Sequence, residues 1–203
     1  MIDTMDVRRA LSDLAEVRER LARLQRFEGY SAPAAAASGV AALIAGLVQS
    51  RLVPLPHAGG DLRLYAVIWM SCLAAGLALN YGTVAAWLLR HRSSVARSQF
   101  RSAALSILPS IVLGGALSLA LADHGQYALL PGAWFAFYAI GLFASREVIP
   151  PGAVSVTIGF AVLALLFLAT PLQSVSLAWW VMPLGFGLGQ LAIGALIWGE
   201  RRA

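Results

Sequence analysis

Few side chains in this 203-residue chain have the type and spacing that catalysis or metal binding needs. The three histidines lie outside the long apolar runs of the sequence, and the single cysteine, Cys72, has no partner within the chain for a disulfide or a redox pair. No cluster of histidine, cysteine, aspartate and glutamate has metal-ligand spacing, and no glycine-rich phosphate loop follows a strand pattern. The sequence therefore predicts a chain that is not an enzyme and has no metal or cofactor.

The apolar runs are themselves free of Asp, Glu, Lys, Arg and His. Proton-coupled pumps and many transporters keep ionisable groups at membrane depth, because such groups are costly there and persist only for function. A haem held by two histidines between helices and an intramembrane serine protease of the rhomboid type both need a histidine within a span. The sequence therefore excludes a haem protein of this kind and a rhomboid-type protease.

The composition predicts the elements that surround these residues. Hydrophobic residues make up 59% of the chain and charged residues 12%, about half the usual charged share of a soluble domain. A soluble domain of this size has too much surface to bury so many apolar side chains. We expect an all-α polytopic membrane protein with six transmembrane helices in residues 31–203. The six runs are Ser31–Gln49, Leu64–Leu89, Ala103–Ala122, Tyr127–Ser145, Ala153–Thr170 and Val175–Trp198.

The arginines predict the orientation in the membrane. All 15 basic residues are arginine, and 13 of them fall on one side of the membrane if the six runs cross it, against Arg51 and Arg63 on the other. Cytoplasmic loops carry the excess of basic residues. We expect a bacterial inner-membrane protein with both termini in the cytoplasm and the lipid bilayer as a partner. The same rule accounts for the net charge of +5 without a nucleic-acid partner.

Residues 1–30 differ from the rest of the chain in composition, because they hold 12 of the 25 charged residues. A cytoplasmic amphipathic helix is expected from Thr4 to Phe27, with an apolar seam at heptad spacing. Three surfaces could bury this seam: the protein's own bundle, a protein partner or second copy, and the lipid surface. The seam residues, which are candidates for partner binding, are Val7, Ala10, Leu14, Val17, Leu21 and Leu24.

Small residues recur every four positions within several of the runs, which is typical of surfaces where membrane helices pack closely. In the last run, Pro183 and the glycines also permit a hinge or a ligand slot. Two amides inside runs, Asn80 and Gln190, are expected to join helices or to contact a small polar ligand. The helix-packing candidates are Ser106, Ser110, Gly114 and Ser118 in the third run and Gly185 and Gly189 in the sixth; similar rows are Ser38, Ala42 and Gly46, and Ala78, Gly82 and Ala86.

Two stretches resemble a family of small six-span bacterial inner-membrane proteins of acidobacterial type, which has no assigned activity. They are GAWFAFYAIGLFASREVIPPG (132–152) and WWVMPLGFGLGQLAIGALIWGERR (179–202). The family shares a charged amino-terminal helix, a glycine-rich last span and a basic tail, and the resemblance implies a regulatory or accessory role.

Two functions are consistent with these patterns. The first is a non-enzymatic accessory or regulatory subunit, which anchors or recruits a partner through the amino-terminal helix and the small-residue helix faces. The alternative is a small-solute binding or transport subunit, because six spans in about 200 residues also resemble the substrate-binding component of an energy-coupling-factor transporter.

Overall fold

The computed structural model describes residues 13–14, 31–57, 59–90, 94–146, 149–200 and 202, and these form helices and connecting turns without a strand. The predicted all-helical class is confirmed for this part of the chain. The helices are α2 (Ala32–Leu52), α3 (Gly59–Arg90), α4 (Ser94–Asp123), the short η1 (Tyr127–Leu129), α5 (Leu130–Ala144), α6 (Ala153–Ala169), the single turn α7 (Gln173–Ser176), the π-helical η2 (Pro183–Gly187) and α8 (Leu188–Glu200).

Within the part of the chain that the structure describes, four helical segments are long and apolar enough to cross a membrane: Ala32–Leu52, Gly59–Ala86, Ala104–Asp123 and Tyr127–Ala144. Several long apolar helices of this kind indicate a membrane location and are compatible with a polytopic protein. Two predicted spans are not among the four. The α6 helix is apolar but has 17 residues, and the last helix is interrupted by its π-helical segment.

The last apolar run does not form one helix from Val175, as its composition predicts. The turn α7 ends at Ser176, and the final helical stretch begins at Val181. Between them, the backbone N–H of Trp179 donates to the carbonyl oxygen of Pro54 in the α2–α3 loop (3.1 Å). This contact between distant parts of the chain replaces a helical hydrogen bond and accounts for the break.

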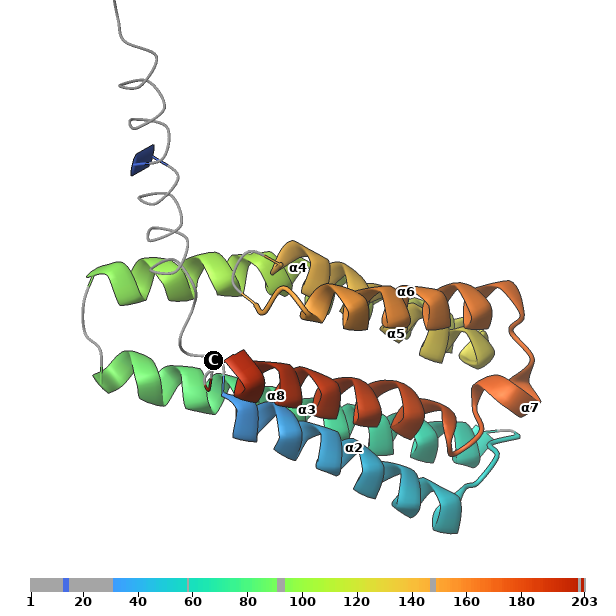
Figure 1. Ribbon diagram of the computed structural model, residues 1–203. Helices are drawn as coiled ribbons and strands as arrows, with labels where there is room; N and C mark the ends of the chain where they lie inside the picture. Colours follow the sequence, from blue (N-terminus) through green and yellow to red (C-terminus); the bar gives the residue numbers. More distant parts are fainter. Residues whose placement is uncertain are drawn as a thin grey trace, which may run out of the picture.

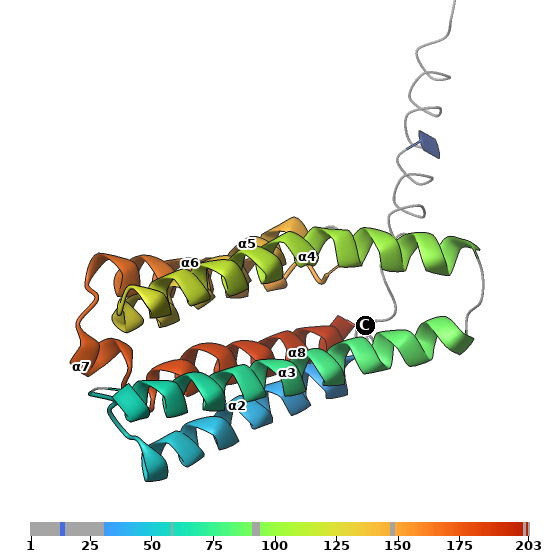
Figure 2. The same cartoon turned by 180° about the vertical axis from the view of Figure 1, so that it is seen from behind.

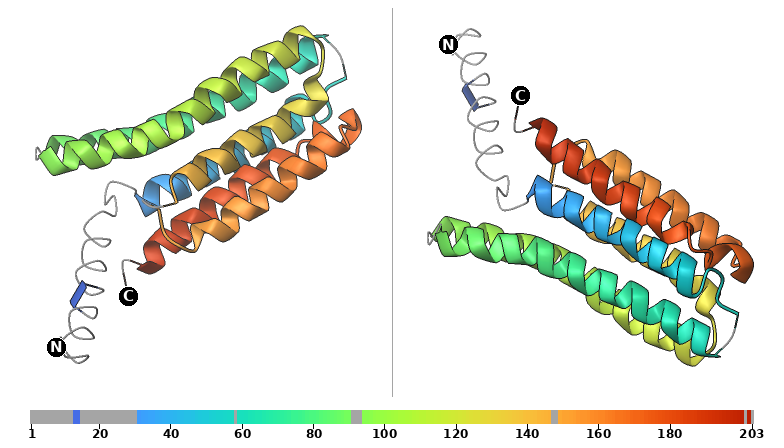
Figure 3. Two further views of the ribbon diagram at one scale, coloured as in Figure 1. Left: turned by 90° about the horizontal axis from the view of Figure 1, so that it is seen from above. Right: turned by 90° about the horizontal axis from the view of Figure 1, so that it is seen from below.

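The long described helices form two layers (Figures 1 and 2). In one layer α2 packs between α3 and the last helix, and in the other α5 packs between α4 and α6. The views from above and below show the same arrangement (Figure 3). The α2–α3 loop and α7 lie at one end of the bundle, whereas the end of α3, the start of α4 and the end of α8 lie at the other. We call these the outer and the inner end.

Aromatic rings pack between the two layers. Phe135 of α5 is fully buried and lies 5.1–5.9 Å, between ring centroids, from Phe160, Phe167 and Phe186. Tyr138, one turn further along α5, meets Phe160 and Phe186 edge-on at 4.7 and 5.1 Å. Offset and edge-on ring pairs are favourable packing arrangements. These rings join α5, α6 and the last helix into one core.

Glycines let α2 approach the last helix closely. A Cβ atom on Gly39 would lie 2.8 Å from the carbonyl oxygen of Gly187, and a Cβ atom on Gly46 would overlap the ring of Pro183. Nearer the inner end, a Cβ atom on Gly194 would lie 3.1 Å from the carbonyl oxygen of Ala32. Since the first and last of these obstacles are backbone atoms, they cannot move aside by a rotamer change.

Replacing Gly39 with alanine is therefore expected to destabilise the bundle. The added methyl group should force α2 and the last helix apart and lower the free energy of unfolding by about 1–3 kcal/mol. The measurement is thermal unfolding of the detergent-purified protein, followed by tryptophan fluorescence.

Gly82→Ala is the matched control, because a Cβ atom at Gly82 of α3 would meet no other atom within 4 Å. It should leave the unfolding temperature unchanged or slightly raised. Equal stability of the Gly39→Ala and Gly82→Ala variants would show that the close contact between α2 and the last helix does not exist.

Candidate functional site

The π-helical segment of the last helix borders the aromatic core. A Cβ atom on Gly185 would lie 2.3 Å from the ring of Phe135, and one on Gly189 would lie 2.5 Å from the ring of Phe160. The two glycines predicted from spacing thus lie where rings from the opposite layer occupy the space of a side chain. A π-helical segment is often found at functional sites, and here it sets the face of the helix that meets these rings.

The predicted amides Asn80 and Gln190 each donate a hydrogen bond to another helix. Asn80 Nδ2 of α3 donates to Ser38 Oγ of α2 at 2.7 Å and to the carbonyl oxygen of Gly76 at 2.9 Å. Gln190 Nε2 of α8 donates to the hydroxyl of Tyr138 on α5. The two amides lie between different pairs of helices, so the structure does not bring them together into one polar site.

The small-residue row on α4 lies against α5. Ser110 Oγ lies 3.1 Å from where a Cβ atom on Gly141 would be, and Gly114 packs on the ring of Phe137. Ser118 Oγ accepts a hydrogen bond from Trp134 Nε1 at 2.7 Å. Ser106 continues the same row and is half-buried.

A row with the same spacing on α3 has the opposite environment. Ala78, Gly82 and Ala86 are all exposed, so this row does not pack against another described helix. Spacing alone does not distinguish the two rows.

The outer end contains a buried polar cluster that sequence reasoning missed. Gln49 near the end of α2 is fully buried, and its Nε2 donates to the carbonyl oxygen of Leu177 at 2.9 Å. Its Oε1 accepts from Trp69 Nε1 of α3 at 2.8 Å. The hydroxyls of Tyr65 and Ser176 are also buried at this end and have no partner among the described residues. Because Gln49 ends an apolar run, its sequence position resembles that of an ordinary interface residue.

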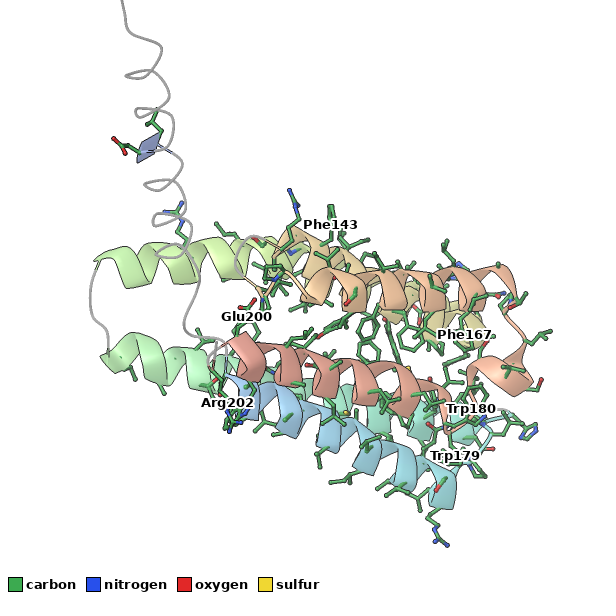
Figure 4. The ribbon with its side chains drawn as sticks, viewed as in Figure 1. Phe143, Phe167, Trp179, Trp180, Glu200 and Arg202 are labelled. Carbon is green, nitrogen blue, oxygen red and sulfur yellow. The ribbon has the colours of Figure 1, made fainter. Side chains whose placement is uncertain are left out.

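Arginines at the inner end stack on aromatic rings. The guanidinium of Arg146 lies 4.6 Å from the ring centre of Phe143 and also donates to its carbonyl oxygen, while that of Arg202 lies 4.8 Å from the ring centre of Trp198. Figure 4 shows Phe143 and Arg202 toward one end of the bundle and Trp179 and Trp180 at the other. Aromatic and basic side chains in these places are typical of the two membrane–water interfaces.

Of the amino-terminal seam, the structure describes one residue. Asp13 and Leu14 are helical, and the Leu14 side chain is 64% exposed. Val7, Ala10, Val17, Leu21 and Leu24 lie outside the described residues. The single described seam position is thus not covered by the bundle.

Hydrogen bonds between helices account for several polar side chains that the structure describes inside the bundle. Among the described residues no three His, Cys, Asp or Glu residues gather in a way that could hold a metal ion. The polar groups at the centre of the bundle are amides and hydroxyls, which join helices. This arrangement holds the described helices in a defined geometry and leaves their ends and outer faces exposed to other molecules.

Replacing Gln49 with leucine should leave the Trp69 indole N–H and the Leu177 carbonyl buried without partners. Each such group costs about 1–3 kcal/mol, so the variant should unfold at a clearly lower temperature than the wild type. Tyr65→Phe is the control, because it removes a buried hydroxyl that has no hydrogen-bond partner among the described residues. Thermal unfolding in detergent compares them, and a Gln49→Leu variant as stable as Tyr65→Phe would contradict the bridging role.

Comparisons with known proteins do not assign this chain to a family. No family model matches the chain, and no curated protein and no solved structure matches it. The resemblance carried by residues 132–152 and 179–202 therefore stays a prediction.

Proposed function

We propose that this chain is a six-span inner-membrane protein with both termini in the cytoplasm, which serves as a non-catalytic accessory or regulatory subunit. In this proposal the bundle is an anchor, and the amino-terminal segment recruits a partner through its apolar seam.

The helix lengths support six spans. At 1.5 Å per residue, the 17 residues of α6 extend about 26 Å, close to the roughly 30 Å of a bilayer core. The last helical stretch, residues 181–200, is longer than α6. Trp198 lies in its last turn, and Arg202 follows it. In a six-span arrangement the inner end, which carries most of the arginines, faces the cytoplasm.

The exposure of Leu14 is the observation that carries the accessory role. An apolar side chain on a charged helix is costly to leave in water, and a seam of such residues every three and four positions is built for burial against another helix. Since the bundle does not bury Leu14, a second polypeptide is the covering that this exposure favours. A six-helix bundle whose central polar groups join its own helices is suited to anchoring such a contact.

The alternative, a small-solute subunit, has one observation in its favour. The π-helical segment Pro183–Gly187 lies beside the aromatic core, and segments of this kind recur at ligand sites. Such a ligand would have to displace packed rings of Phe135 and Phe186. A solute that raises the unfolding temperature of the wild type but not of a Gly185→Ala variant would support this alternative.

Orientation can be tested with a reporter fused after Ala203. Both termini should be cytoplasmic, so a reporter that is active only in the cytoplasm should be active and a periplasmic reporter silent. A fusion within the α2–α3 loop, for instance after His57, is the control and should give the reverse pattern. Periplasmic activity after Ala203 would reject the orientation.

The seam can be tested by replacing Leu14 and Leu21 together with glutamate. The bundle should insert and unfold as in the wild type, while a partner that co-purifies with the wild type from native membranes should be lost. Ala15→Glu with Ala22→Glu is the matched control, because it adds the same charge at the same spacing outside the seam. Quantitative mass spectrometry of the purified material compares the three proteins. Retention of the full set of partners by the Leu14/Leu21 variant would refute recruitment, whereas a destabilised bundle would assign the seam to the bundle itself.

A further inference from the structure

The inner ends of α3 and α4 extend beyond the helices that flank them (Figures 1 and 2). On α3, the pairs Trp69–Gln49 and Asn80–Ser38 fix the antiparallel register with α2. This register puts the start of α2 near residue 86, and α3 continues to Arg90.

On α4, the pair Ser118–Trp134 and the contact between Ser110 and Gly141 fix the register with α5 in the same way. The end of α5 at Ala144 then lies near residue 107, and α4 begins much further out, at Ser94. We call residues 87–90 of α3 and 94–103 of α4 the hairpin end.

The positive charge of the protein is concentrated around the hairpin end. Four arginines fall between residues 90 and 101, and no aspartate or glutamate occurs between residues 62 and 122. The other 191 residues of the chain, outside 90–101, hold 11 arginines and 10 acidic residues, and residues 1–30 hold six of each. Of the net charge of +5, this hairpin therefore supplies most.

Apolar residues accompany these arginines. Leu89 is 68% exposed and Arg101 is exposed, so the hairpin end presents both kinds of side chain outward. Other arginines at the inner end also lie against apolar side chains: Arg146 stacks on Phe143, and Arg202 stacks on Trp198. This combination is suited to the headgroup layer of a membrane, which is apolar below and anionic above.

The length of α3 brings the hairpin end to that layer. Its apolar run, Leu64–Leu89, extends about 39 Å as a helix, which exceeds the roughly 30 Å hydrocarbon core. A helix longer than the core tilts, and tilting lowers its end toward the membrane surface.

We propose that the hairpin end is a binding surface for anionic phospholipid headgroups. Arg97 and Arg101, four residues apart on one face of α4, bind the phosphodiester groups, and Leu89 lies in the apolar part of the interface. The proposal rests on the membrane location proposed above, and it does not depend on the amino-terminal seam.

The test compares the wild type with an Arg97→Gln/Arg101→Gln variant. Native mass spectrometry of the full-length protein in detergent measures binding of phosphatidylglycerol relative to phosphatidylcholine. Each arginine near an anionic surface contributes about 1 kcal/mol, a factor of about five, so the preference for phosphatidylglycerol should fall roughly 25-fold. Arg8→Gln/Arg9→Gln removes the same charge from the amino-terminal segment and should keep the wild-type preference.

Further results decide between the proposal and its alternatives. An Arg97→Lys/Arg101→Lys variant keeps the charge and should retain most of the preference, which separates lipid binding from a loss of folding. Inorganic phosphate should not compete with phosphatidylglycerol at equal concentration, since the site takes a lipid. An unchanged lipid preference in the Arg97→Gln/Arg101→Gln variant overturns the proposal, and so does loss of a co-purifying acidic protein without a change in lipid binding. Detergent micelles have no sides, so a wrong orientation would not alter these outcomes.

Discussion

The close approach of α2 to the last helix is the contact on which the rest of the bundle depends. Lipid tails are as apolar as leucine, so helices in a membrane associate through packing rather than through the hydrophobic effect. Gly39 and Gly187 bring the two backbones together, and the opposite face of the last helix then places Gly185 and Gly189 against the rings of the other layer. Glycines on two faces of one helix thus connect the two layers.

Hydrogen bonds between polar side chains determine which helices pack together. Gln49 joins α2 to α3 and to the segment before the last helix, Asn80 joins α3 to α2, and Gln190 joins α8 to α5. Each hydrogen bond in an apolar surrounding is modest in energy, but an unpaired amide there is costly, so these pairs select one helix arrangement. The central polar groups therefore serve the fold, and the features that suit interaction lie at the ends: the exposed Leu14 and the arginines of the hairpin end.

The all-helical class and most helix boundaries could be predicted from the apolar runs, because a membrane helix must be apolar along its whole length. Three features could not. The rows Ser110–Gly114 and Ala78–Gly82 have the same spacing, yet the first is buried and the second is exposed, because the packing of α5 against α4 decides which face is covered. The break before Val181 depends on a hydrogen bond to Pro54, which no local pattern encodes. The role of Gln49 likewise requires a partner 128 residues away.

The central claim is that the amino-terminal seam is covered by another polypeptide. The most direct measurement is photo-crosslinking in native membranes from a light-activated residue placed at position 14. The account predicts a cross-linked product that contains a second polypeptide chain, and a strongly reduced yield when the light-activated residue is placed at position 15, outside the seam. A cross-link from position 14 to α3, α4 or another part of the same bundle, or to lipid alone, would contradict it.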